Sequence, residues 1–151
     1  MVYDVYVQDF DNALSHALVA IRHYHRHSSQ QLNRQQMFSL GLGIMSSLYF
    51  VAIKCRHCSV RDMALYALST EPLQEGPWNR DSAFLMTRML VEMEEKFRIP
   101  GTVGPEGIPV EARIIGVNFL LKAEMGELVF VVDRPGERVK RFVKYGSELG
   151  N

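Results

Sequence analysis

Apolar residues recur every three or four positions in the first part of the chain, the spacing of one face of an α-helix. A first helix is predicted to begin at Asp9 or Asp11, whose short side chains suit an N-cap, and to end near His27. Its buried face consists of Phe10, Ala13, Leu14, Ala17, Leu18 and Ile21.

A second helix is predicted over residues 35–54. Its second half is apolar on nearly all sides, so neighbouring elements should enclose it, and we expect both Leu48 and Phe50 to lie in the core. Ser59 then offers an N-cap for a third helix, with Asp62 three residues on as in a capping box. The inward face of this third helix is predicted to carry Val60, Met63, Ala64, Ala67 and Leu68.

A fourth helix should follow the Pro- and Gly-containing segment after residue 70. Asn79 or Asp81 can cap it, and Arg88 and Glu92 form an ordinary solvated pair on its outer face. Its inward residues are predicted to be Met86, Met89, Leu90, Met93 and Phe97.

The pattern changes after Pro100. A loop rich in Gly and Pro is followed by three short β-branched and aromatic runs, 113–122, 127–133 and 138–145, which turn-forming sequences separate. The fold class is therefore α+β, with about four helices followed by a small antiparallel β-meander. A length of 151 residues supports one compact domain over 1–151. Within it we expect a helical part over 9–98, a linker over 99–109 and a β part over 110–146.

Charge and hydropathy argue against two classes of direct partner, nucleic acids and membranes. Lys and Arg together number 17, as do Asp and Glu, and a neutral chain lacks the basic excess that an autonomous DNA-binding domain uses on phosphates. The most apolar stretch, 40–53, is too short to cross a membrane as a helix, and the chain begins without the pattern of a signal peptide. We therefore expect no direct nucleic-acid or membrane partner, and a location in the nucleus or cytoplasm.

The two cysteines, Cys55 and Cys58, enclose Arg56 and His57. A zinc site would need a second pair of ligands, and a thioredoxin-type redox pair would follow a strand rather than a helix. The cluster is better explained as a helix C-terminus at which Cys55 packs inward while Arg56 and His57 face water. A stripe of histidines on the first helix, at positions 16, 23 and 27, is explained as a solvated polar face, so neither a metal nor another cofactor is predicted.

The segment between the third and fourth helices holds the only tryptophan of the chain, Trp78, three residues after Glu75. A tryptophan at this place either closes the end of a helical core or forms the wall of a ligand pocket. In the second case Glu75 could serve as an acid or base. The residues alone leave both alternatives open.

Six segments of the chain together form a recognisable pattern. They are Leu48 to Arg56, Val60-Arg61, Ala64 to Leu68, the loop Glu75 to Asn79, the helix end Glu92 to Glu95, and the connection Ile108 to Arg113. This pattern resembles the C-terminal part of the regulatory region of fungal binuclear zinc-cluster transcription factors. The resemblance covers roughly residues 38–119. The DNA-binding module of that family holds two zinc ions with six cysteines, whereas this chain has two cysteines in all.

The resemblance implies a stand-alone regulatory or protein-interaction module that does not itself bind DNA. It would take a protein partner or a small hydrophobic ligand through Trp78, Glu75 and Arg56, and it allows a homodimer. The alternative is a cofactor-independent enzyme of fungal secondary metabolism, with isomerase, cyclase or lyase-type acid–base chemistry on the same scaffold and His57, Glu75 and Tyr49 as catalytic groups. The first hypothesis is favoured because the sequence displays no convergent set of catalytic groups.

Overall fold

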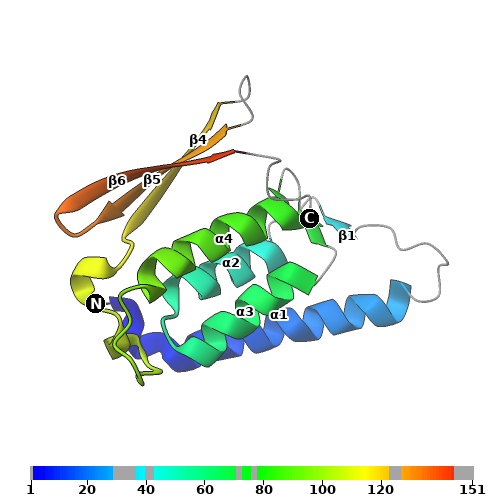
Figure 1. Ribbon diagram of the computed structural model, residues 1–151. Helices are drawn as coiled ribbons and strands as arrows, with labels where there is room; N and C mark the ends of the chain where they lie inside the picture. Colours follow the sequence, from blue (N-terminus) through cyan, green and yellow to red (C-terminus); the bar gives the residue numbers. More distant parts are fainter. Residues whose placement is uncertain are drawn as a thin grey trace. The chain divides into compact units, whose positions relative to one another are not determined.

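The chain forms an α+β structure of four helices followed by a small antiparallel meander, which confirms the predicted fold class (Figure 1). The computed structural model describes residues 2–28, 37–39, 43–70, 73–75, 78–122 and 127–144. Two compact units, Met1–Gly107 and Ile108–Asn151, make up the chain, and each is described by itself. Their division falls within the predicted connection 99–109, and a single domain over 1–151 stays a prediction.

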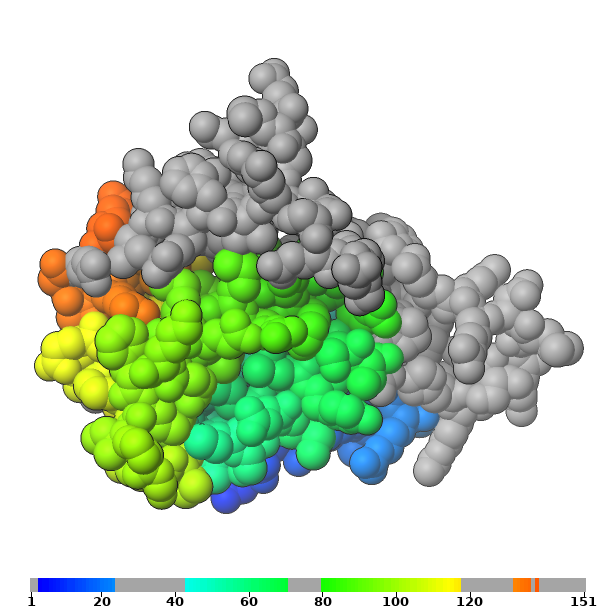
Figure 2. Space-filling view, in the orientation of Figure 1, coloured from blue at the N-terminus to red at the C-terminus, as the bar shows by residue number. Residues whose placement is uncertain are grey.

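The helical unit is built in layers. A short 3-10 helix, η1 (Val2–Tyr6), leads directly into α1 (Val7–Ser28), which is followed by α2 (Ile44–Lys54), α3 (Cys58–Thr70) and α4 (Arg80–Glu95). α2 and α3 contact each other, and both contact α1 and α4, so they form the middle of the unit (Figure 1). In the space-filling view α3 and α4 lie side by side on one face (Figure 2).

The core of this unit is apolar and has the helical spacing that the sequence displays. It comprises Phe10, Leu14, Ala17, Ile21, Met45, Leu48, Val51, Ala52, Cys55, Val60, Ala64, Ala67, Leu68 and Ala83. Leu48 has no exposed surface, as expected, but Phe50 is 46% exposed, so its predicted place in the core is wrong. Met63 and Phe97, also predicted to face inward, are 46% and 50% exposed. Phe97 differs because α4 ends at Glu95, two residues before it.

The predicted second helix begins too early. Met37–Ser39 is a strand, β1, paired in parallel with β2 (Leu73–Glu75), and β2 pairs antiparallel with β3 (Trp78–Asn79). α2 starts only after Gly43, whose φ of −146° and ψ of −94° are not helical. A glycine disfavours extension of the helix through this position, because glycine loses more backbone freedom than any other residue when it is fixed in a helix.

The other predicted helices agree more closely with the structure. α1 begins at Val7 rather than at Asp9 or Asp11, because η1 continues into it without a break. The solvated pair on α4 is confirmed: Arg88 Nε lies 2.7 Å from Glu92 Oε1. None of the helices in the described part of the chain is long and apolar enough to cross a membrane.

The second unit contains the meander. β4 (Gly116–Lys122), β5 (Glu127–Arg134) and β6 (Glu137–Lys144) pair antiparallel in chain order, with Phe119 opposite Phe130. The turn between β5 and β6 holds Pro135 and Gly136, and Gly136 has a φ of +78°, which glycine adopts without strain. The predicted turn over 124–126 lies outside the described residues, whereas the strands on either side of it, β4 and β5, are described.

Candidate functional site

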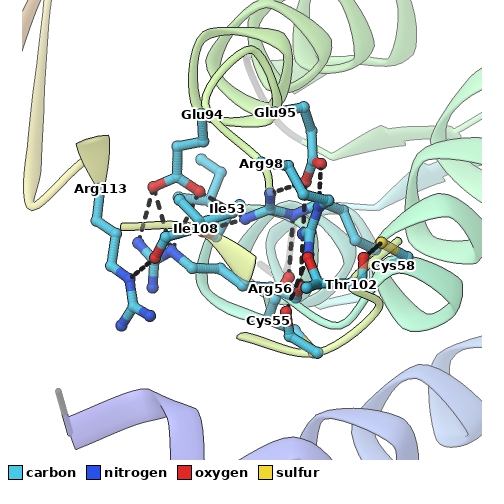
Figure 3. A network of polar contacts seen from close by, with 12 residues as sticks. Ile53, Cys55, Arg56, Cys58, Glu94, Glu95, Arg98, Thr102, Ile108 and Arg113 are labelled. Carbon is cyan, nitrogen blue, oxygen red and sulfur yellow. Dashed lines mark hydrogen bonds and ion pairs between the residues drawn. The ribbon is translucent and has the colours of Figure 1, made fainter. Parts of the chain in front are cut away.

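Helical structure is interrupted between α2 and α3 at residues 55–57, and this helix break is the centre of the candidate site. Cys55 is extended (φ −81°, ψ 115°), so α2 ends with carbonyl groups that need donors. Arg61 Nε donates to the Cys55 carbonyl over 3.0 Å, and Arg98 Nη2 donates to the Arg56 carbonyl over 2.8 Å (Figure 3). Guanidinium groups suit this place because the C-terminal end of a helix is electronegative.

Glu94, near the end of α4, joins the side chains of Arg56 and Arg61. Its Oε1 lies 2.8 Å from Arg56 Nη2 and its Oε2 lies 2.7 Å from Arg61 Nη2, and at most 2% of each of the three side chains is exposed. Arg56 Nε is also within 3.2 Å of Glu94 Oε2, so the guanidinium approaches the carboxylate with two nitrogens. Buried charges persist only when they are paired and hydrogen-bonded, and this geometry meets that condition.

Glu95 extends the cluster toward the surface. It accepts hydrogen bonds from Arg61 Nη1 over 2.6 Å and from Arg98 Nη2 over 2.9 Å. Burial alone would raise the pKa of Glu95, but these hydrogen bonds and positive charges outweigh it and lower the pKa below its ordinary value. We refer to Arg56, Arg61, Glu94, Glu95 and Arg98 together as the junction network.

The loop after α4 closes over the start of α3. Arg98 Nη1 donates to the Gly104 carbonyl over 2.9 Å, and the Cys58 amide donates to the Val103 carbonyl over 2.8 Å, which satisfies one open donor in the first turn of α3. A side-chain carbon at Gly107 would overlap the Thr102 hydroxyl and the Arg98 guanidinium. The close packing of this loop therefore requires a glycine at position 107.

The arrangement is suited to holding helices together rather than to proton transfer. Its carboxylates and guanidinium groups bind one another, and the guanidinium groups of Arg61 and Arg98 also bind the backbone carbonyls at the break. The junction network thus connects α2, α3, α4 and the following loop.

The Cys-Arg-His-Cys cluster lies at this break, and the prediction for it is right in part. Cys55 packs inward as expected, and burial raises the pKa of its thiol. Arg56 was expected to face water and instead is buried, because Glu94 supplies a partner for its charge inside the unit. His57 is partly exposed, its Nδ1 lies 3.0 Å from Ser59 Oγ, and its carbonyl accepts the Arg61 amide. His57 therefore takes the N-cap position predicted for Ser59.

The other proposed site residues lie on separate elements. Tyr49 is on α2, about 9 Å along the helix axis from Cys55, and burial raises its pKa to about 12. Glu75 in β2 and Trp78 in β3 are register partners. The structure describes the backbone of these two residues, and their side chains lie outside the described part.

The histidine stripe on α1 is exposed at His16 and His23, and the side chain of His27 lies outside the described part. Within the residues that the structure describes, no group of three or more His, Cys, Asp or Glu side chains is placed to hold a metal ion.

Sequence reasoning missed the buried carboxylate and its second arginine, although a signal was present. Glu94 lies four residues after Leu90, and Arg61 lies three residues before Ala64, so both fall on the inward stripes of their helices. Opposite charges on two inward stripes indicate a buried ion pair.

A local similarity links the chain to a fungal protein. It is 36% identical over 59 residues to the aspercryptin biosynthesis cluster-specific transcription regulator of Emericella nidulans, a stretch that makes up 39% of this chain and 10% of the regulator. This match supports a transcription-regulator-like relationship over that stretch. No protein-family model matches the chain, and no solved structure matches it.

Proposed function

We propose that the chain is a regulatory, protein-interaction module related to part of a fungal transcription regulator, and that it does not itself bind DNA. The observation that carries this proposal is the local similarity to the Emericella nidulans regulator. The equal number of acidic and basic residues supports the second half of the proposal, since a DNA-binding domain draws most of its affinity from phosphate contacts.

The structure of the helical unit supports an interaction role in a further way. Its charged centre is occupied by contacts that join its own elements, while several large apolar side chains remain at the surface of α3 and of the segment after α4. These are Met63, Tyr66, Phe97, Ile99 and Val103. Apolar side chains on a firmly held scaffold supply the contact area that a protein partner buries.

We further propose that Glu75 and Trp78 take part in binding the partner. They are neighbours across the β2–β3 pair, next to the start of α4. Tryptophan is enriched among the residues that carry binding energy at interfaces. In this role, Trp78→Phe and Glu75→Gln should weaken binding and leave the fold intact.

A tethering experiment tests the proposal. The chain is fused to a heterologous DNA-binding domain in a fungal reporter strain, and reporter output is compared with that of the DNA-binding domain alone. We expect a severalfold change in output, which Trp78→Phe and Glu75→Gln reduce. Glu92→Gln, a change in an exposed pair on α4, is the matched control and should leave the output unchanged.

An unchanged reporter would contradict the interaction role, provided that the fusion is expressed and folded. The DNA-binding half of the proposal is tested with the isolated chain by titrating duplex DNA at physiological salt. Sequence-selective binding in the nanomolar range would overturn it.

A further inference from the structure

The short 3-10 helix η1 covers an aromatic surface formed by α1 and α2. The Tyr3 ring lies 6.0 Å from the Phe50 ring in an edge-to-face arrangement and 6.4 Å from the Phe10 ring, and the rings of Phe10 and Phe50 are 5.9 Å apart. Tyr3 and Phe50 stay 39% and 46% exposed. The three rings therefore form a cluster at the edge of the core, which η1 covers only in part.

Two cations border this cluster, and η1 presents a complementary group to each. The Lys54 ammonium lies 5.6 Å from the centre of the Tyr3 ring, in a cation–π arrangement. Arg56 Nη1 lies 3.9 Å from Asp4 Oδ1. Tyr3 and Asp4 thus meet an apolar surface and two positive charges with an aromatic ring followed directly by a carboxylate.

The Arg56 guanidinium and the backbone of Lys54 do not depend on η1 for their place. Arg56 is held by Glu94 over 2.8 Å, a closer contact than the one it makes with Asp4, and Lys54 belongs to the last turn of α2. Phe10 and Phe50 likewise belong to α1 and α2. The surface beneath Tyr3 and Asp4 is therefore built by the helices, and η1 is its occupant.

We propose that Phe10, Phe50, Lys54 and Arg56 form a docking surface for a segment of a protein partner that carries an aromatic residue followed by an acidic one, and that Tyr3 and Asp4 of this chain close the surface in the absence of the partner. This inference rests on the proposed interaction function and names the chemistry of the partner. Charge complementarity and the seated Tyr3-Asp4 pair are the observations that commit it to this class of segment.

The test uses a fluorescent peptide with the sequence of residues 2–8 as the probe and the full chain as the receptor. In the unmodified chain η1 competes with the probe. The double variant Tyr3→Ala/Asp4→Asn removes that competition, so we expect it to bind the probe at least about tenfold more tightly, with a dissociation constant below about 1 mM. Adding Phe50→Ala to the double variant should return binding to the level of the unmodified chain.

Matched changes separate this result from a general loosening of the chain. Val5→Ala alters an exposed residue of the same 3-10 helix and should not strengthen probe binding. Melting curves identify any variant that does not fold, and in that case Asp4→Asn alone should still strengthen binding by a smaller factor. A probe that carries Tyr3→Ala should not bind.

Equal binding by the unmodified chain and the folded double variant would overturn the inference, as would binding that Phe50→Ala does not reduce. A dimer of the unmodified chain that Tyr3→Ala separates into monomers would also overturn it, since η1 would then occupy a second copy. Failure of the peptide to bind while the tethered reporter still responds would reject this surface and leave the proposed function standing.

Discussion

At the level of single residues, each arginine around the end of α2 is paired with at least one carboxylate. Arg56, Arg61 and Arg98 face Glu94, Glu95 and Asp4 at distances from 2.5 to 3.9 Å. A buried ion pair adds little to stability compared with apolar residues of the same shape, but removal of one partner leaves an uncompensated charge inside the protein. The helical unit is therefore destabilised when any one charged partner of this network is removed.

Replacement of Glu94 should be the most damaging single change in the network. Glu94→Gln keeps the size of the side chain and removes the charge shared by Arg56 and Arg61, so we expect the free energy of unfolding to fall by roughly 3–5 kcal/mol. Urea titration followed by circular dichroism measures this loss. Glu92→Gln, in the exposed pair with Arg88, should change stability by less than about 0.5 kcal/mol. Similar losses for the two variants would contradict the buried role of Glu94.

Glu95 should give the helical unit an acid-sensitive component. Its pKa is lowered in the folded state, so the carboxylate contributes stability that is present above its ordinary pKa of 4.5 and is lost as the pH falls through the lower folded value. Denaturation midpoints measured from about pH 6 to about pH 3 should fall less steeply in Glu95→Gln than in the unmodified chain. Identical slopes would show that Glu95 ionises alike in the folded and unfolded states.

The sequence predicts the apolar residues of the core better than its charged ones. Leu48 and Cys55 are buried as their spacing indicates, whereas Arg56 was expected in water. Burial of an arginine depends on a partner 38 residues away in the chain, and local periodicity contains no information about such a distance. The sequence therefore predicts that residues 55–58 lie at the end of a helix, but it does not predict the buried ion pairs that form there.

At the level of elements, α2 is apolar on nearly all sides because several neighbours cover it. α1, α3 and α4 contact α2, and Tyr3 of η1 lies against the half-exposed ring of Phe50. The prediction that neighbours enclose this helix is therefore right for most of its circumference. The strand before α2 could not be predicted from residues 35–54, because β1 depends on pairing with β2, more than thirty residues later.

Two substitutions on α2 test this description of its surroundings. Leu48→Ala should lower the free energy of unfolding by roughly 2–5 kcal/mol, since Leu48 is fully buried and the change leaves a cavity. Phe50→Ala should cost about 1 kcal/mol, because the ring is half-exposed and contributes mainly its contacts with Tyr3 and Phe10. Chemical denaturation of both variants provides the comparison, and equal losses would contradict the exposed position of Phe50.

At the level of the whole molecule, the contacts that define the helical unit end at Gly107. The apolar core cluster and the junction network both lie within residues 1–107. Gly107, the last residue of the unit, accepts a hydrogen bond from the Ile99 amide over 2.8 Å. A domain that holds its own core can fold alone, so this unit meets the structural requirement for independence.

Residues 1–107 expressed alone should therefore fold, with helical circular dichroism and a single cooperative unfolding transition in urea. A fragment of residues 1–97 is the matched comparison. It keeps all four helices but lacks Arg98 and the loop, so the Arg56 carbonyl loses its guanidinium donor and the Cys58 amide loses the Val103 carbonyl. We expect the shorter fragment to unfold at a lower urea concentration. If residues 1–107 do not fold while the full chain does, the helical unit depends on residues 108–151, and the chain is the single domain that its length predicts.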